Sequence, residues 1–229
     1  MSYLLRSFWV LILWPATTVW GQENKKRNQP PPVQFVAEAG AHYFFKTGSL
    51  ADNLDPEIEK VAQHQRKGFA WSGEAGVVLG GQHHITVVRT QSSRSKDFSL
   101  GLVGPGGGAF FPANSTEDIA YTGLNYGTKL PLGKISTNWI AMVKAGLGVW
   151  SYRNEVTINA GNLGNSSGAV KESGFGYMAG FRIGYQFSPS LAWFAGTDLL
   201  GGSVKVEDEQ ENLSQIRLST TLRITLPGG

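Results

Sequence analysis

The sequence predicts an all-β fold: an eight-stranded antiparallel transmembrane up-and-down β-barrel, preceded by an N-terminal signal peptide. Three observations predict it. Eight segments alternate between large apolar residues and small or polar residues, with the period of two that a β-strand imposes on its side chains. No amphipathic helical pattern is large enough to cover a core. The connections between the eight segments alternate strictly between short and long.

The N-terminus has the three parts of a secretory signal over residues 1–21. Arg6 supplies the positive charge, FWVLILW (8–14) is a short apolar run, and Gly21 is a small residue at the cleavage point. Residues 22–32, QENKKRNQPPP, are polar and rich in proline, as in an extended tail. The predicted domains are therefore a signal peptide at 1–21, a periplasmic tail at 22–32 and a barrel at 33–226.

The first four predicted strands are 33–45, 69–79, 84–93 and 119–130. In the first, Phe35 lies on the apolar face and Glu38 on the other. In the second, Trp71 and Glu74 take opposite faces in the same way. The third, HITVVRTQSS, has the weakest alternation of the eight.

The last four predicted strands are 138–152, 174–187, 191–202 and 213–226. The stretch GFGYMAGFRIGYQF has Phe181 on a face of large apolar residues and Arg182 on a face of small and polar ones. Most of these segments run to about ten residues or more, whereas strands of soluble proteins average about 5–6 and membrane strands need about 9–11. We therefore expect Phe181 to face lipid and Arg182 to face the interior of a closed barrel.

The connections predict which end of the barrel faces out. Three are tight: GGQH (80–83), PLGK (131–134) and SPS (188–190). Four are long and polar, at 47–68, 94–118, 153–173 and 203–212. The long ones are expected to lie together outside the cell. The first of them also predicts a short helix, with Asp55 as cap, Pro56 in the first turn and Ile58, Val61 and Ala62 on one face.

This pattern resembles the small outer-membrane β-barrel family of Gram-negative bacteria, the eight-stranded type of OmpA, OmpX and the opacity proteins. The resemblance covers residues 33–226 and rests on strand number, turn asymmetry and the signal peptide. It implies two aromatic girdles at the membrane interfaces. The outer girdle is expected at Phe69, Trp71, Phe175 and Tyr177, and the periplasmic girdle at Trp139, Tyr185, Phe187 and Trp193.

The charged residues of the interior face predict a lumen charge network. Its expected members are Glu38, Glu74, Arg89, Lys144, Arg182, Asp198, Arg217 and Arg223, with Lys129 on the same face. An eight-stranded barrel is just wide enough for its side chains to fill, so paired charges would close the lumen. A narrow, basic-lined pore for small anions is the alternative interpretation.

A soluble, lipocalin-like barrel is the rival fold, with its apolar face turned inward around a ligand. It would expose Gly146, Gly148, Gly180 and Gly184 to water and crowd the large aromatic residues into the lumen. The membrane barrel fits the pattern better.

The sequence predicts no enzyme, no cofactor and no metal site. None of the four histidines begins the His-x-Ser pattern of barrel lipid A deacylases, and the chain has no cysteine. GPGGGAF (104–110) is not followed by a helix that could bind phosphate. The net charge of +3 gives no argument for nucleic acid.

These observations predict a protein of the cell outer membrane with a structural or surface-interaction role carried by its extracellular loops. Its expected partners are outer-membrane lipid and an extracellular ligand or surface met by the loops, with no role for nucleic acid. The alternatives are a small passive anion-preferring channel and the soluble ligand-binding barrel.

Overall fold

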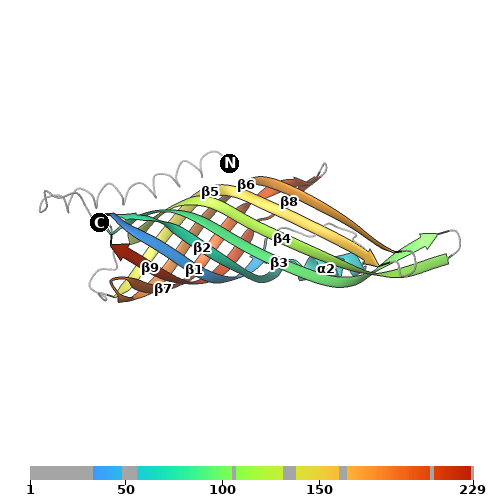
Figure 1. The fold of residues 1–229 in the computed structure, drawn as a ribbon, viewed down its shortest axis with the longest axis horizontal. Helices are drawn as coiled ribbons and strands as arrows, with labels where there is room; N and C mark the ends of the chain where they lie inside the picture. The colour runs from blue at the N-terminus through green and yellow to red at the C-terminus, as the bar shows by residue number, and fades with distance from the viewer. Residues whose placement is uncertain are drawn as a thin grey trace, which may run out of the picture.

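The computed structural model describes residues 33–47, 56–104, 107–130, 138–159, 164–206 and 209–227. The expected signal peptide and tail lie outside this range. The described elements, drawn in Figure 1, are β1 (Val33–Lys46), α2 (Pro56–His64), β2 (Lys67–Leu79), β3 (His83–Gly104), β4 (Gly107–Leu130), β5 (Trp139–Asn159), β6 (Asn165–Ser188), β7 (Leu191–Val206), β8 (Glu209–Asn212) and β9 (Gln215–Pro227).

Eight of these strands close into one antiparallel ring. Each strand from β1 to β7 pairs with the next, β7 pairs with β9, and β9 pairs with β1. The short β8 pairs with β7 outside the ring. The predicted eight-stranded antiparallel barrel is therefore confirmed, with β9 as its eighth strand.

The two faces of the ring differ as the alternation predicted. On β6, Phe181 is 45% exposed on the outside, and Arg182 is 2% exposed on the inside. On β9, Leu222 faces outward and Arg223 is buried. Because successive side chains of a strand point to opposite faces, this alternation gives a ring that is mostly apolar outside and holds buried charged residues inside.

Tight turns join strands at the end of the barrel where β1 begins and β9 ends. Between β2 and β3, Gly80 and Gly81 have φ values of 60° and 69°, and Gln82 N donates to Leu79 O at 3.2 Å. Positive φ at both central residues is the geometry of a type I′ turn, which only glycine and a few polar residues adopt readily. Between β6 and β7, the turn is Pro189–Ser190; the predicted turn at 131–134 lies outside the described residues.

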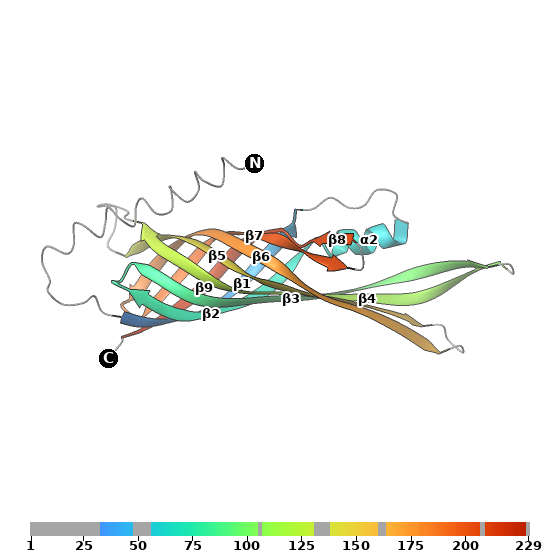
Figure 2. The same cartoon turned by 90° about the horizontal axis from the view of Figure 1, so that it is seen from above.

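At the other end, three of the four predicted loops prove to be mostly strand. β3 and β4 stay paired as far as Gly104 and Gly107, and β5 and β6 as far as Asn159 and Asn165. Figure 2 shows these hairpins projecting well beyond the barrel. The expectation of loops at 94–118, 153–173 and 203–212 was wrong because the backbone pairing of the ring continues through these segments. Their sequences lack the long, regular alternation that predicted the strands of the ring.

The short helix predicted in the first long connection is present as α2, Pro56–His64. Its expected cap, Asp55, lies outside the described residues. Val61 is buried, but Ile58 is 45% exposed, so only part of the predicted apolar face packs against the molecule. In the described part of the chain, no helix has the length and apolar character needed to cross a membrane.

Candidate functional site

A layer of ion pairs crosses the inside of the ring, centred on Glu38. This residue of β1 lies opposite Glu74 on β2 and Arg223 on β9. Arg223 donates from Nε to Glu38 Oε1 at 2.7 Å. Arg182 Nη1 lies 3.0 Å, and Lys144 Nζ 3.4 Å, from Glu38 Oε2. One carboxylate thus holds cations from β5, β6 and β9.

Two further carboxylates complete this ionic layer. Glu74 accepts hydrogen bonds from Lys144 Nζ at 2.5 Å and from the Thr86 hydroxyl. Asp198 on β7 accepts one from Arg182 Nη2 at 3.0 Å. Lys144 therefore separates the two neighbouring glutamates, and Arg182 bridges Glu38 to Asp198. Charges buried this deeply are tolerated when they are paired and hydrogen-bonded.

Arg217 lies at the outer side of the ionic layer, directly opposite Asp198 in the β7–β9 register. Its guanidinium donates to Thr90 Oγ1 at 2.7 Å and to Gln215 Oε1 at 3.0 Å. It also lies over the Trp150 ring, 5.8 Å from the centroid. Arg217 therefore joins the ionic layer to the aromatic side chains above it.

Seven of the eight residues expected in the lumen network do face inward, and the eighth does not. Arg89 is exposed on the outside of β3, between Val88 and Thr90, which are both buried. The prediction for Arg89 was wrong because apolar Val87 and Val88 are adjacent in HITVVRTQSS, so the local pattern did not fix which face is inward. Lys129, on β4, is half-buried.

His42 brings a hydroxyl and a carboxylate together inside the barrel. Its Nε2 lies 2.6 Å from Ser72 Oγ, and its Nδ1 lies 3.8 Å from Asp198 Oδ2. These are the residue types of a Ser-His-Asp triad, but 3.8 Å is too long for a hydrogen bond, and Oδ2 already accepts from Arg182. All three side chains are buried. The group extends the ionic layer and offers no approach for a substrate.

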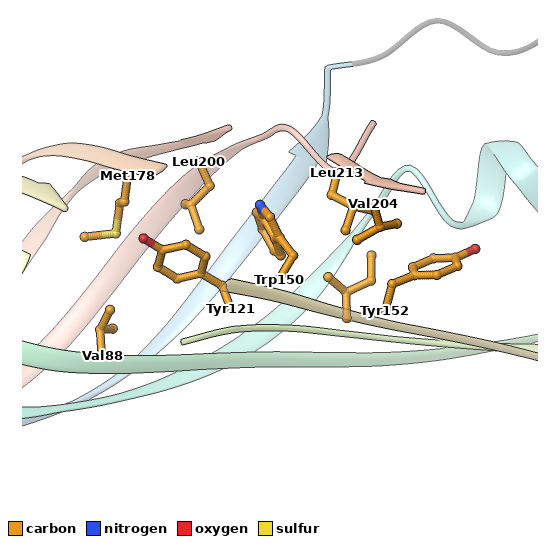
Figure 3. Packing of buried hydrophobic residues seen from close by; sticks show 9 residues of the cluster. Val88, Tyr121, Trp150, Tyr152, Met178, Leu200, Val204 and Leu213 are labelled. Carbon is orange, nitrogen blue, oxygen red and sulfur yellow. The ribbon is translucent and has the colours of Figure 1, made fainter. Parts of the chain in front are cut away.

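An apolar layer fills the ring on the outer side of the ionic layer. Figure 3 shows its side chains pointing toward one another from several strands. The members are Val88, Ile119, Tyr121, Trp150, Tyr152, Met178, Leu200, Val204 and Leu213. Trp150 is fully buried, and its Nε1 donates to the backbone oxygen of Gly201 at 3.2 Å.

Two glycines make room for Trp150. A Cβ at Gly176 on β6 or at Gly202 on β7 would lie 2.6 Å from Trp150 Nε1, which is closer than real Cβ contacts. Gly202 also has a φ of 144°, where a side chain would add strain. The position of the largest interior side chain is therefore fixed by small residues on the facing strands.

A second ionic cluster lies beyond the apolar layer and holds α2. Glu117 on β4 accepts from Lys46 Nζ at 2.6 Å and pairs with Arg94 on β3. Arg94 also donates to the backbone oxygen of Gln65, just after α2, and lies over the Phe44 ring. Burial lowers the pKa of Arg94, and Glu117 opposes this shift. The cluster ties the helix end to the two strands beneath it.

The aromatic residues expected in the girdles lie on the outside of the ring. At the end with the tight turns, Trp139 faces Tyr185, which faces Trp193. The Tyr185 ring lies 5.5 Å from Trp139 and 5.3 Å from Phe187. Toward the other end, exposed rings are carried by Phe69, Trp71, Phe175 and Tyr177.

The distribution of apolar and charged residues decides between the two barrel types. The large exposed side chains outside the ring are mostly aliphatic or aromatic, and the buried interior holds the ion pairs. A lipocalin-like barrel would need the reverse, so that alternative was wrong. A closed ring with an apolar outside satisfies its backbone groups internally, as a lipid environment requires. The chain is a transmembrane β-barrel.

Comparison with solved structures finds bacterial surface and outer-membrane proteins at low sequence identity. The chain aligns with Neisserial surface protein A at 16% identity and a TM-score of 0.46, covering 84% of this chain and 96% of the other. A major outer membrane protein of Thermus thermophilus aligns at 12% identity and 0.48, covering 85% and 99%. The attachment invasion locus protein of Yersinia pestis aligns at 10% identity and 0.40, covering 86% and 98%. No protein-family model and no curated protein sequence matches the chain.

Sequence reasoning missed the apolar layer and the Lys46–Glu117–Arg94 cluster. A signal for each was present. Trp150 and Tyr152 occupy the inward phase of their strand, where small or polar residues were expected. Arg94 and Glu117 are equally far from the centre of a hairpin at 105–106, so a longer β3–β4 hairpin would have paired them.

Proposed function

We propose that this outer-membrane barrel is a closed structural anchor that presents its outer hairpins to an extracellular ligand or surface. In this proposal, the signal peptide at 1–21 directs export, and the short turns lie in the periplasm. The aromatic residues at the two ends of the ring sit at the membrane interfaces, where their amphipathic rings are favoured.

The barrel is proposed to be closed because side chains fill the inside of the ring. The seven charged residues of the ionic layer and the nine residues of the apolar layer are each at most 7% exposed. Residues lining a continuous aqueous channel would keep surface accessible to water. Two filled layers in series therefore favour a plug of paired and packed side chains over a passive anion channel.

The outer hairpins are the surface most suited to recognition. The hairpin strands β3–β4 and β5–β6 extend the ring's hydrogen-bonded ladder and carry mostly polar, exposed side chains. Binding residues are often held on segments that a rigid scaffold positions. The ionic cluster around Glu117 fixes the base of this outer face.

Conductance in a planar lipid bilayer tests the closed barrel. The refolded protein should pass no steady current, while a water-filled porin measured in the same bilayer should. A large and stable anion-selective conductance from the unmodified chain would contradict the plug and favour the channel.

A further inference from the structure

Arg89 is a charged residue on the mostly apolar outer side of the ring. Its side chain is exposed and makes no hydrogen bond or ion pair with the described part of the chain. Its Cα partners are Gly73 on β2 and Thr122 on β4. A Cβ on Gly73 would meet no atom within 4 Å, so the space beside Arg89 on that flank is open.

The strand register places Arg89 just below the outer aromatic girdle, here called the outer rim, on the side of the membrane centre. Trp71 on β2 faces Gln91, the next outward residue of β3. Arg89 is two residues from Gln91, or about 7 Å along the strand. An arginine side chain spans a similar length and extends toward the interface while its stem stays on apolar surface. The guanidinium can therefore reach the level of the lipid headgroups.

The aromatic rim is interrupted at this point. Exposed rings lie at the outer level on β1 and β2 and again on β6, but none lies there on the described parts of β3, β4 and β5, where polar residues alternate with Ala120 and Val149. The polar notch consists of the outward residues Arg89, Gln91, Thr122 and Ser151, with the apolar Ala120 and Val149 beside them. Ser93 and its Cα partner Asp118 lie one step further out, above the notch. Gln91, Thr122 and Ser151 are amide or hydroxyl donors near one permanent cation. Such a group is complementary to a phosphate.

We propose that the polar notch binds the phosphate of a phosphorylated lipid headgroup in the outer leaflet. The proposal rests on the proposed membrane orientation, in which the long hairpins face out. A lipid phosphate would supply the counter-charge that Arg89 lacks, at the depth where headgroups lie. A second copy of the chain fits less well, because the described outward residues between the two aromatic rims include no aspartate or glutamate.

Lipid retention measured by native mass spectrometry tests this proposal. The protein is released from nanodiscs of phosphatidylcholine containing phosphatidic acid as the probe. Wild type should retain phosphatidic acid preferentially, and Arg89→Gln should lose about tenfold in apparent affinity, as expected when a charge-assisted hydrogen bond is removed. Arg89→Lys should show an intermediate loss. The matched control is Arg153→Gln, which removes an exposed arginine on β5 that already pairs with Glu155, and its retention should equal wild type.

Three results would overturn the inference. The first is equal retention by wild type and Arg89→Gln. The second is full displacement of the lipid by millimolar inorganic phosphate, which would indicate a site for the free anion. The third is a dimer that Arg89→Gln dissociates. Heat-modifiable migration on a detergent gel is recorded for every variant. A wild-type chain that does not fold into bilayers would contradict the membrane barrel itself, whereas a folded chain without phosphate preference would contradict only the notch.

Discussion

At the scale of the residue, Glu38 is the side chain on which the interior depends most. It holds Arg223, Arg182 and Lys144 together, so Glu38→Gln would leave three buried cations sharing fewer carboxylates. Breaking a buried pair costs about 3–5 kcal/mol, and we expect a loss of stability of that size in urea titrations of protein folded into vesicles. Glu155→Gln is the control, because it removes an exposed pair worth at most about 1 kcal/mol. Equal effects would show that the interior pairs do not stabilise the fold.

The depth of a single outward side chain in the membrane can also be tested by substitution. Phe181 faces lipid well inside the apolar band, so Phe181→Arg should reduce the free energy of folding into vesicles by about 2–4 kcal/mol. Phe187, an exposed residue beside the last turn, lies close to the interface, where the same change costs about 0–1 kcal/mol. A penalty at Phe187 that matches the one at Phe181 would contradict this placement of the membrane.

The sequence alone was sufficient to assign some charged residues to the inside or outside of the barrel, but not others. Arg182 could be assigned to the interior because large residues flank it at every second position. Arg89 could not, since Val88 belongs to the apolar layer inside the barrel and Val87 to the lipid face outside. A local alternation identifies a face only if one of the two faces is polar at that level. The partners of Glu38 come from β5, β6 and β9, so their contacts depend on the register of the closed ring.

At the scale of the element, the outer parts of β5 and β6 form an extension that the ring does not need. Asn154 and Val170 are Cα partners, so an Asn-Gly turn can replace residues 155–169 and rejoin the strands in register. We expect this shortened hairpin to leave heat-modifiable migration and thermal unfolding of the barrel unchanged, because the Trp150 layer keeps all its contacts. Replacing 149–175 instead removes Trp150 and should abolish folding. If the first deletion alone prevents folding, the extension is part of the folding core.

The strands themselves were predictable, but the ends of the long ones were not. The inner part of β6 alternates sharply, and its range was predicted closely at the turn with Pro189. Its outer part, NSSGAVKES, has no apolar face, so the sequence predicted a loop there. Hydrogen bonding to β5 makes it a strand, and that pairing leaves no periodic signal when both faces are wet.

At the scale of the whole molecule, the asymmetry of its two ends predicts its orientation. The chain has no cysteine, so single cysteines can be introduced cleanly. Cysteine at Ser167, near the tip of the β5–β6 hairpin, should react with an impermeant thiol reagent in intact cells. Cysteine at Ser190, in the turn between β6 and β7, should react only after the cells are opened. The reverse pattern would invert the topology.

The long β3–β4 hairpin gives the molecule a mechanical property. Both strands run without a break from the membrane-spanning ring to Gly104 and Gly107, and both are bonded to neighbouring strands over part of that length. The hydrogen bonds between antiparallel strands lie across the strand direction. A partner that pulls on the tip, away from the cell, moves β3 and β4 together and therefore loads in shear the bonds that join β3 to β2 and β4 to β5. A ligand held at the tip would be tethered to the membrane by the same ladder that closes the barrel.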